Sequence, residues 1–179
     1  ADDIQSKVFN GSSWDVGWTN IDTNAPDNTT YDGAFGATVD KTTGNIYLAY
    51  AASIATLGTD DDIRTAVYSG GIWTSKTDIL TNDTKGITGA KISFDENTGD
   101  IYAVYSAQTT SGTANTGNVY WKKSTDRMTT WGVEQGPINT TADDIYGARV
   151  NSMSNERIYV TWYGATPDDL FGNTIADLT

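Results

Sequence analysis

Apolar residues occur along this chain in short runs rich in Val, Ile, Tyr and Trp, separated by Gly, Asn, Asp, Ser and Thr. This is the usual pattern of β-strands joined by turns. Within the runs 46–50, 101–105 and 158–162, apolar residues alternate or nearly alternate with others, as they do in packed strands. No window shows a helical period of any length. The pattern therefore predicts an all-β protein.

The runs recur at a nearly fixed spacing. A Gly-Ala pair in one strand recurs 53 and 58 residues apart, at Gly36, Gly89 and Gly147. An Ile-Tyr pair in the following strand recurs 55 and 57 residues apart, with its tyrosines at Tyr47, Tyr102 and Tyr159. A tryptophan after a tight turn recurs 59 and 58 residues apart, at Trp14, Trp73 and Trp131. Each repeat therefore holds about four short strands, of which the first two form a hairpin.

A unit of four antiparallel strands in about 57 residues is typical of a β-propeller blade. We expect one segment spanning 1–179, with repeats at about 31–80, 86–138 and 145–179 and an N-terminal strand pair at 3–20. The predicted fold is about three four-stranded antiparallel blades of a larger β-propeller ring of about six to eight blades. The remainder of the ring would come from the rest of a longer propeller chain or from identical copies of this one.

The recurring Trp and Tyr residues are expected to lie in the core, because large aromatic side chains bury much apolar area between neighbouring blades. Those near the tips of loops remain candidates for stacking on a ligand. The hairpins within each blade are expected on one face of the ring. The other loops form the opposite face, which propellers generally use for ligands.

One turn of the second full repeat carries a specific motif. It reads Ser-Thr-Asp-Arg-Met-Thr-Thr-Trp, from Ser124 to Trp131, and is similar to the Asp-box or BNR repeat, Ser-x-Asp-x-Gly-x-Thr-Trp. Met128 stands where the family has Gly. We expect Asp126 to accept N–H groups of its own turn, and Thr130 and Trp131 to complete the box.

The resemblance implies a sialidase-like propeller in which the box is structural and lies away from the active site. A sialidase would also carry an Arg-Ile-Pro motif, which this chain lacks, together with an arginine triad, a Tyr/Glu pair and an Asp acid. We expect Arg64 and Arg149 to form surface or inter-blade ion pairs instead. The sequence favours an extracellular, non-catalytic propeller with a structural, adhesive or glycan-binding role at the cell surface. The alternative is part of a sialidase-like glycoside hydrolase.

Charge and composition narrow the range of functions. Eleven Lys and Arg against 23 Asp and Glu give a formal net charge of −12, so nucleic acid and anionic membranes are poor partners. The chain has no run of about 18 apolar residues, which is the length needed to span a bilayer. The chain contains no His and no Cys, which excludes a Ser-His-Asp or Cys-His mechanism and a His-based zinc site. Catalysis would have to use carboxylates, Tyr, Arg and Lys, and we expect no cofactor.

Acidic residues are frequent in the loops of the expected ligand face. Asp60, Asp61 and Asp62 are candidates for a Ca²⁺ site, since calcium prefers several oxygen ligands. No Asp-x-Asp-x-Asp-Gly loop accompanies them, so negatively charged, solvated loops are the simpler interpretation.

Four Asn-x-Ser/Thr triplets are candidate glycosylation sites, at Asn10, Asn28, Asn82 and Asn139. The last three recur 54 and 57 residues apart, in the same loop of each repeat. Glycosylation would explain this placement, and so would descent from one ancestral repeat; both interpretations stay open. We expect the chain to be secreted, outside the cell or at its surface, and glycans to be among its partners.

Overall fold

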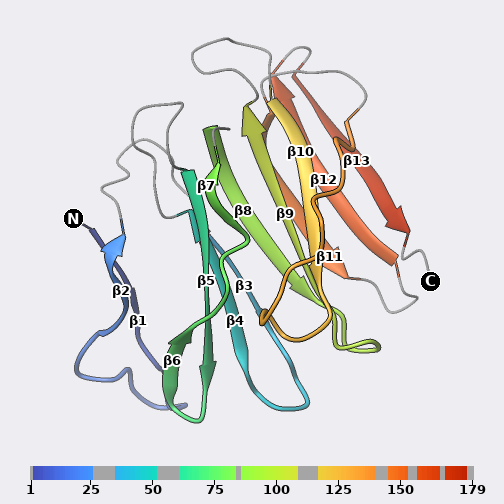
Figure 1. The fold of residues 1–179 in the computed structure, drawn as a ribbon. Helices are drawn as coiled ribbons and strands as arrows, with labels where there is room; N and C mark the ends of the chain where they lie inside the picture. Colours follow the sequence, from blue (N-terminus) through green and yellow to red (C-terminus); the bar gives the residue numbers. More distant parts are fainter. Residues whose placement is uncertain are drawn as a thin grey trace.

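The computed structural model describes residues 2–25, 35–51, 61–83, 86–108, 117–139, 145–152, 157–165 and 168–176 (Figure 1). These residues form 13 β-strands and no helix, grouped into four antiparallel sheets, which we call sheets I to IV. The sheets follow one another in sequence order across the molecule (Figure 1).

Sheets I and II form the N-terminal half. Sheet I pairs two strands: β1 (Asp2–Ser6) and β2 (Thr19–Ala25). Sheet II has five: β3 (Phe35–Val39), β4 (Ile46–Ala51), β5 (Asp61–Ser69), β6 (Ile72–Ser75) and β7 (Leu80–Asp83). Both β6 and β7 pair with β5, so together they form the fourth strand of one blade.

Sheets III and IV form the C-terminal half. Sheet III holds β8 (Gly86–Phe94), β9 (Ile101–Gln108) and β10 (Gly117–Ser124). Residues 131–138 run along β10 as an irregular fourth strand, through backbone bonds such as the two between Trp121 and Gln135. Sheet IV holds β11 (Ile145–Ser152), β12 (Arg157–Ala165) and β13 (Asp168–Ala176), and no fourth strand pairs with β13 among the described residues.

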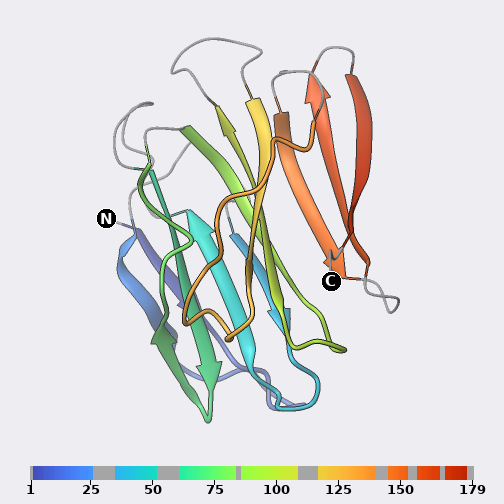
Figure 2. The same cartoon turned by 45° about the vertical axis from the view of Figure 1, so that its right-hand side comes forward.

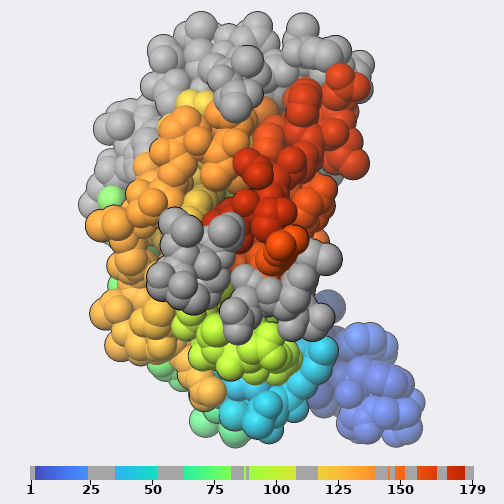
Figure 3. Space-filling view, turned by 90° about the vertical axis from the view of Figure 1, so that its right-hand side faces the viewer, coloured from blue at the N-terminus to red at the C-terminus, as the bar shows by residue number. Residues whose placement is uncertain are grey.

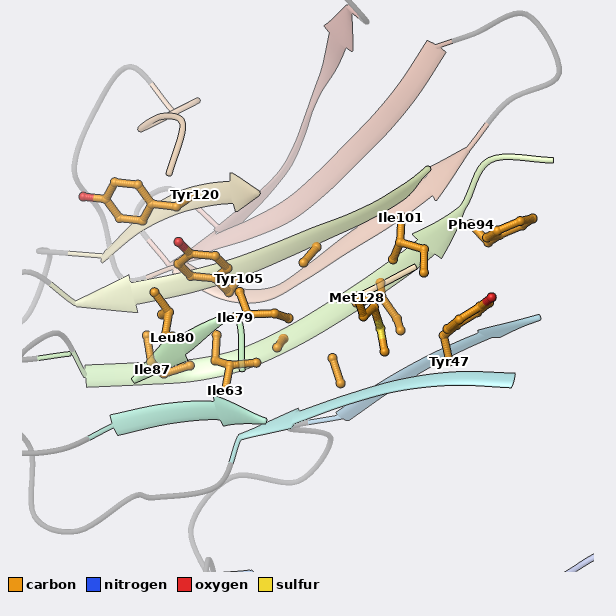
Figure 4. Close-up of a cluster of buried hydrophobic side chains, with 14 of the residues drawn as sticks. Tyr47, Ile63, Ile79, Leu80, Ile87, Phe94, Ile101, Tyr105, Tyr120 and Met128 are labelled. Carbon is orange, nitrogen blue, oxygen red and sulfur yellow. The ribbon is translucent and has the colours of Figure 1, made fainter. Parts of the chain in front are cut away.

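The sheets pack face to face, as blades do around a propeller axis (Figure 2). Because strand side chains alternate between two faces, β9 contributes to two cores. Ile101 and Tyr105 lie in the core between sheets II and III, shown in Figure 4, whereas Tyr102 and Val104 lie in the core between sheets III and IV. A smaller core joins sheets I and II. The expected all-β propeller of about three blades is therefore confirmed.

The register of the strands aligns the repeats more closely than the sequence does. The three repeat tyrosines occupy equivalent positions, with the pairs Thr38↔Tyr47, Ser93↔Tyr102 and Asn151↔Tyr159. By this register Gly36 is equivalent to Lys91, so its expected alignment with Gly89 is wrong by two residues. The physical reason is packing: a Cβ on Gly36 would lie 2.7 Å from the Cα of Lys91, whereas one on Gly89 would meet nothing within 4 Å.

In sheets II and III, an aspartate side chain caps the hairpin turn between the first two strands of the sheet. Asp40 accepts the backbone N–H of Thr43 at 3.1 Å and its hydroxyl at 2.7 Å, and Gly44 follows with φ of +75°. Asp95 and Gly99 occupy the same places in sheet III, where φ of Gly99 is +79°. A left-handed residue at this point favours glycine, which explains why a Thr-Gly pair recurs before the Ile-Tyr pair.

Candidate functional site

The box residues predicted from the sequence come together in one turn after β10. The carboxylate of Asp126 accepts the Ser124 hydroxyl at 2.9 Å, the Thr130 N–H at 2.8 Å and the Thr130 hydroxyl at 2.6 Å. The Ser124 hydroxyl oxygen accepts the N–H of Met128 at 2.8 Å. Hydrogen bonds, first those from Thr130, lower the pKa of Asp126 below its usual range. The carboxylate thus organises the turn in its charged form.

Met128, which replaces the glycine of the Asp-box pattern, keeps a backbone conformation that glycine favours. Its φ is +66°, and Arg127 before it has φ of +58°. The side chain of Met128 is fully buried in the core between sheets II and III (Figure 4). Buried apolar area therefore offsets the cost of a left-handed backbone at this residue.

The box turn fastens sheet III to sheet II. The indole N–H of Trp131 donates to the carbonyl oxygen of Thr77 at 2.9 Å, and the Thr77 hydroxyl donates to the carbonyl of Thr129 at 2.6 Å. Arg127 adds an ion pair of 3.5 Å to Asp40 in the first turn of sheet II. Trp131 is partly buried against the core between the two sheets. The box thus acts as a clamp between neighbouring blades.

The preceding repeat uses its tryptophan in the same way, although its turn has no box aspartate. Gly70 and Gly71, both with positive φ, form the turn between β5 and β6. Trp73 follows, and its indole N–H donates to the hydroxyl oxygen of Ser6 in sheet I at 2.8 Å. We call Trp14, Trp73 and Trp131 the box tryptophans; the two in sheets II and III each bind the sheet before their own.

A cluster of ionisable side chains lies between sheets I and II. Asp22 on β2 accepts the Tyr50 hydroxyl at 3.0 Å and pairs with Arg64 at 2.9 Å. Burial, then the hydrogen bond to Asp22, raises the pKa of Tyr50 above its usual range, and the same carboxylate raises the pKa of Arg64. The phenol therefore stays protonated, as a donor. The expected inter-blade ion pair of Arg64 is confirmed.

Sheet III repeats part of this arrangement. Tyr105 is equivalent to Tyr50 in the strand register, and its hydroxyl donates to Glu134 at 2.5 Å. The sequence alone does not single out this second tyrosine position, because the carboxylate partners of the two tyrosines stand at unrelated places in the chain. The spacing of Tyr50 and Tyr105, 55 residues as for Tyr47 and Tyr102, was the available signal.

Two cations lie at equivalent positions of neighbouring innermost strands. Lys91 on β8 pairs with Val104, and Arg149 on β11 pairs with Thr161. The Lys91 ammonium donates to the carbonyl oxygen of Phe35 in sheet II. Burial, together with the positive charge of Arg149, lowers the pKa of Lys91 to about 8. This is a concentration of positive charge near the expected axis of an otherwise acidic protein.

The candidate glycosylation sites differ in environment. The Asn10 side chain is exposed, and its oxygen accepts the N–H groups of Ser12 and Ser13 at 3.0 and 2.9 Å. Asn139 is only 8% exposed; its oxygen accepts the Val119 N–H and its amide donates to Asn118. This buried, bonded amide argues against a glycan on Asn139 in the folded protein. Asn28 lies outside the described residues, as does the side chain of Asn82.

The candidate calcium ligands lie largely outside the residues that the structure describes. Asp60 is not among the described residues; Asp61 and Asp62 begin β5, but the structure does not describe their side chains. Within the described part of the chain, no group of three acidic residues is placed to hold a metal ion. Nor does that part contain a helix long and apolar enough to cross a membrane.

No family model matches the chain, and no curated protein sequence matches it. Solved structures do share its fold. A protein of unknown function from Dyadobacter fermentans DSM 18053 is 12% identical with a TM-score of 0.60, over 82% of this chain and 37% of that one. Penicillium chrysogenum α-L-arabinanase, complexed with arabinobiose, is 16% identical with a TM-score of 0.58, over 90% and 52%. The Hadza microbial sialidase Hz136 is 14% identical with a TM-score of 0.53, over 79% and 34%.

At these identities the similarity shows the fold alone, which is that of a β-propeller. The chain spans between a third and about half of the length of these three structures. Its sheets therefore correspond to a section of each of these structures.

Proposed function

We propose that this chain belongs to an extracellular, non-catalytic propeller of the Asp-box kind, with a structural, adhesive or glycan-binding role at the cell surface. The proposal rests on the hydrogen bonds that the Asp-box residues make. The polar groups of Asp126, Ser124 and Trp131 bond within the turn or to the neighbouring sheet, so the most specific motif holds blades together. The Asp22 cluster does the same between sheets I and II.

The glycan-related part of the proposal has separate support. Two of the similar structures are a sialidase and an arabinanase, so this fold serves carbohydrate chemistry in those proteins. The acidic chain, with formal net charge −12, would favour neutral glycans over anionic partners. The part of the chain that the structure describes contributes scaffold to such a protein.

A sialidase-like glycoside hydrolase is the second candidate. One observation favours it: Lys91 and Arg149 occupy equivalent positions on two innermost strands, where positive charge could meet an acidic sugar. Against it, the raised pKa of Tyr50 keeps that phenol protonated and makes it a poor nucleophile.

The test compares binding with hydrolysis. The purified protein is applied to an array of neutral and acidic oligosaccharides and, in parallel, incubated with fluorogenic arabinoside, fructoside and sialoside substrates. The proposal expects binding to immobilised glycans without release of the fluorophore. Release that is abolished by Arg149→Gln would favour the hydrolase. If the protein shows neither binding nor release, the glycan-binding role is contradicted and the structural role remains.

A further inference from the structure

The tip of the hairpin between β1 and β2 holds the only Asn-Gly pair of the chain, Asn10-Gly11. All residues of this tip, 10–13, are exposed, and in Figure 3 the hairpin, in blue, stands clear of the other sheets. The equivalent tip of sheet II, at Gly70 and Gly71, is also exposed, although sheet II lies between two others. Exposure is therefore a property of this turn, and water reaches the carboxamide of Asn10.

The carboxamide of Asn10 folds back over its own turn. Its oxygen accepts the backbone N–H of Ser12 at 3.0 Å, the backbone N–H of Ser13 at 2.9 Å and the Ser12 hydroxyl at 3.0 Å. The Ser13 hydroxyl lies farther from this oxygen, at 3.5 Å, and accepts the side-chain N–H of Asn10 at 3.2 Å. Donors at about 2.7–3.1 Å stabilise a carbonyl oxygen on which negative charge develops. The amide carbon of Asn10 is therefore activated toward a nucleophile.

The backbone nitrogen of Gly11 is the nearest nucleophile along the chain. Its attack on the side-chain carbon Cγ of Asn10 closes a succinimide ring, and an intramolecular reaction of this kind has a large proximity advantage. Gly11 leaves the approach open, because it has no side chain and a Cβ on it would meet nothing within 4 Å. Its φ of +99° is a conformation that glycine adopts readily. The turn thus presents an activated carbon to an unhindered nitrogen.

We propose that Asn10 is a modification site, at which Gly11 closes a succinimide that water opens to a carboxylate. The Gly11 nitrogen bonds to Cγ, and its proton passes through water to the side-chain nitrogen, which leaves as ammonia. Water then breaks one of the two C–N bonds of the ring: opening at Cγ gives aspartate, and opening at the backbone carbonyl gives isoaspartate. The reaction removes the Asn-x-Ser triplet and with it the candidate glycan acceptor. This inference does not rest on the proposed function.

The turn is already suited to the aspartate product. Asp40 in sheet II uses the same pattern, since one carboxylate oxygen accepts the N–H groups two and three residues further on, of Thr42 at 2.8 Å and Thr43 at 3.1 Å. Hydrogen bonds, first that from the Thr43 hydroxyl, hold the pKa of Asp40 below its usual range. A charged aspartate at position 10 accepts the equivalent N–H groups of Ser12 and Ser13. The hairpin therefore keeps its cap when aspartate forms.

The first test follows the Asn10 peptide by mass spectrometry, in protein made without N-glycosylation and incubated at mildly alkaline pH. Peptide mapping should show the change from amide to carboxylate at Asn10, with the succinimide as intermediate, while Asn173 stays an amide. Asn173 is a matched control because it is exposed and its oxygen accepts the N–H of Thr174 at 2.8 Å, but the β-branched side chain of Thr174 crowds the attacking nitrogen. No conversion at Asn10, or equal conversion at Asn173, overturns the proposal.

The second test separates the folded turn from the Asn-Gly sequence alone. Ser12→Ala removes one of three close donors to the Asn10 oxygen and should slow the conversion roughly threefold, which corresponds to about 0.7 kcal/mol. Ser13→Ala removes the hydroxyl at 3.5 Å from this oxygen and should leave the rate nearly unchanged. The folded wild type should convert no more slowly than the same chain in concentrated urea. Equal rates in the two variants, or a slower reaction of the folded protein, would show that the turn does not promote the reaction and would overturn the proposal.

Discussion

At the scale of single residues, backbone conformation and close packing decide which side chains are allowed. Met128 combines a positive φ with complete burial, so conformation and packing favour different residues at one position. At Gly36, close packing alone excludes a side chain, because a Cβ there would lie 2.7 Å from the Cα of Lys91 in the next sheet. The sequence identified Met128 as a departure from the Asp-box pattern but could not show that burial compensates for it.

Replacing Met128 separates these two effects. Met128→Ala should lower the free energy of unfolding by about 2–5 kcal/mol, because it leaves a cavity in the core. Met128→Gly leaves a slightly larger cavity but relieves the left-handed backbone, which costs a non-glycine residue roughly 1–2 kcal/mol. Urea denaturation should therefore show the glycine variant to be no less stable than the alanine variant. A markedly less stable glycine variant would mean that the positive φ is not maintained in solution.

Gly36 and Gly89 form a matched pair on innermost strands. Gly36→Ala should destabilise the fold by roughly 1–3 kcal/mol, since its Cβ would lie 2.7 Å from the backbone of Lys91. Gly89→Ala should be nearly neutral, because nothing lies within 4 Å of the added atom. Thermal unfolding of both variants checks the prediction. Equal effects would contradict the close approach of β3 and β8.

The lowered pKa of Lys91 predicts a pH dependence of stability. Between the folded pKa of about 8 and the ordinary value of 10.5, the unfolded chain binds a proton that the folded chain does not. The stability gained when Lys91 loses its proton is fully present above about pH 10.5 and is lost as the pH falls through 8. Relative to Lys91→Met, the wild type should therefore gain stability from pH 7.5 to 10 in urea denaturation, a range set by these pKa values. A constant difference between the two proteins across this range would refute the shift.

At the scale of elements, the unit that matters is the turn that joins two blades. Asp126 shapes the turn, Trp131 reaches the preceding sheet, and the segment between β6 and β7 accepts it at Thr77. The sequence predicted the turn and its tryptophan, because both belong to a recurring pattern. It could not identify Thr77, nor Asp22 as the partner of Arg64, because neither contact has a local sequence signal and both form only when sheets pack.

Removal of the box carboxylate should weaken the clamp and nothing else. Asp126→Ala loses the bonds from Ser124 and Thr130, so the melting temperature should fall by a few degrees. Asp15→Ala removes the same charge from an exposed position and should leave the melting temperature nearly unchanged. Glycan binding, measured below the melting temperature, should be the same in both variants and the wild type. Lost binding at unchanged stability would move Asp126 from a structural to a functional role.

At the scale of the whole molecule, the account rests on contacts that recur between neighbouring sheets: the box tryptophans of sheets II and III bind the sheet before their own, and sheets III and IV cover the repeat tyrosine of the sheet before theirs. The period of about 57 residues was enough to predict this architecture from sequence. The strand pairing corrected the alignment of Gly36, and it showed that β6 and β7 divide one strand.

The most direct measurement of these contacts is hydrogen exchange at the indole N–H groups, which NMR resolves one by one among the six tryptophans of the chain. Trp73 and Trp131 should exchange slowly, because their N–H groups bond to Ser6 and Thr77 of the preceding sheets at 2.8 and 2.9 Å. Trp14, which is 62% exposed, should exchange quickly. Rapid exchange at Trp73 and Trp131, at the same rate as Trp14, would contradict the packing of each blade onto the one before it.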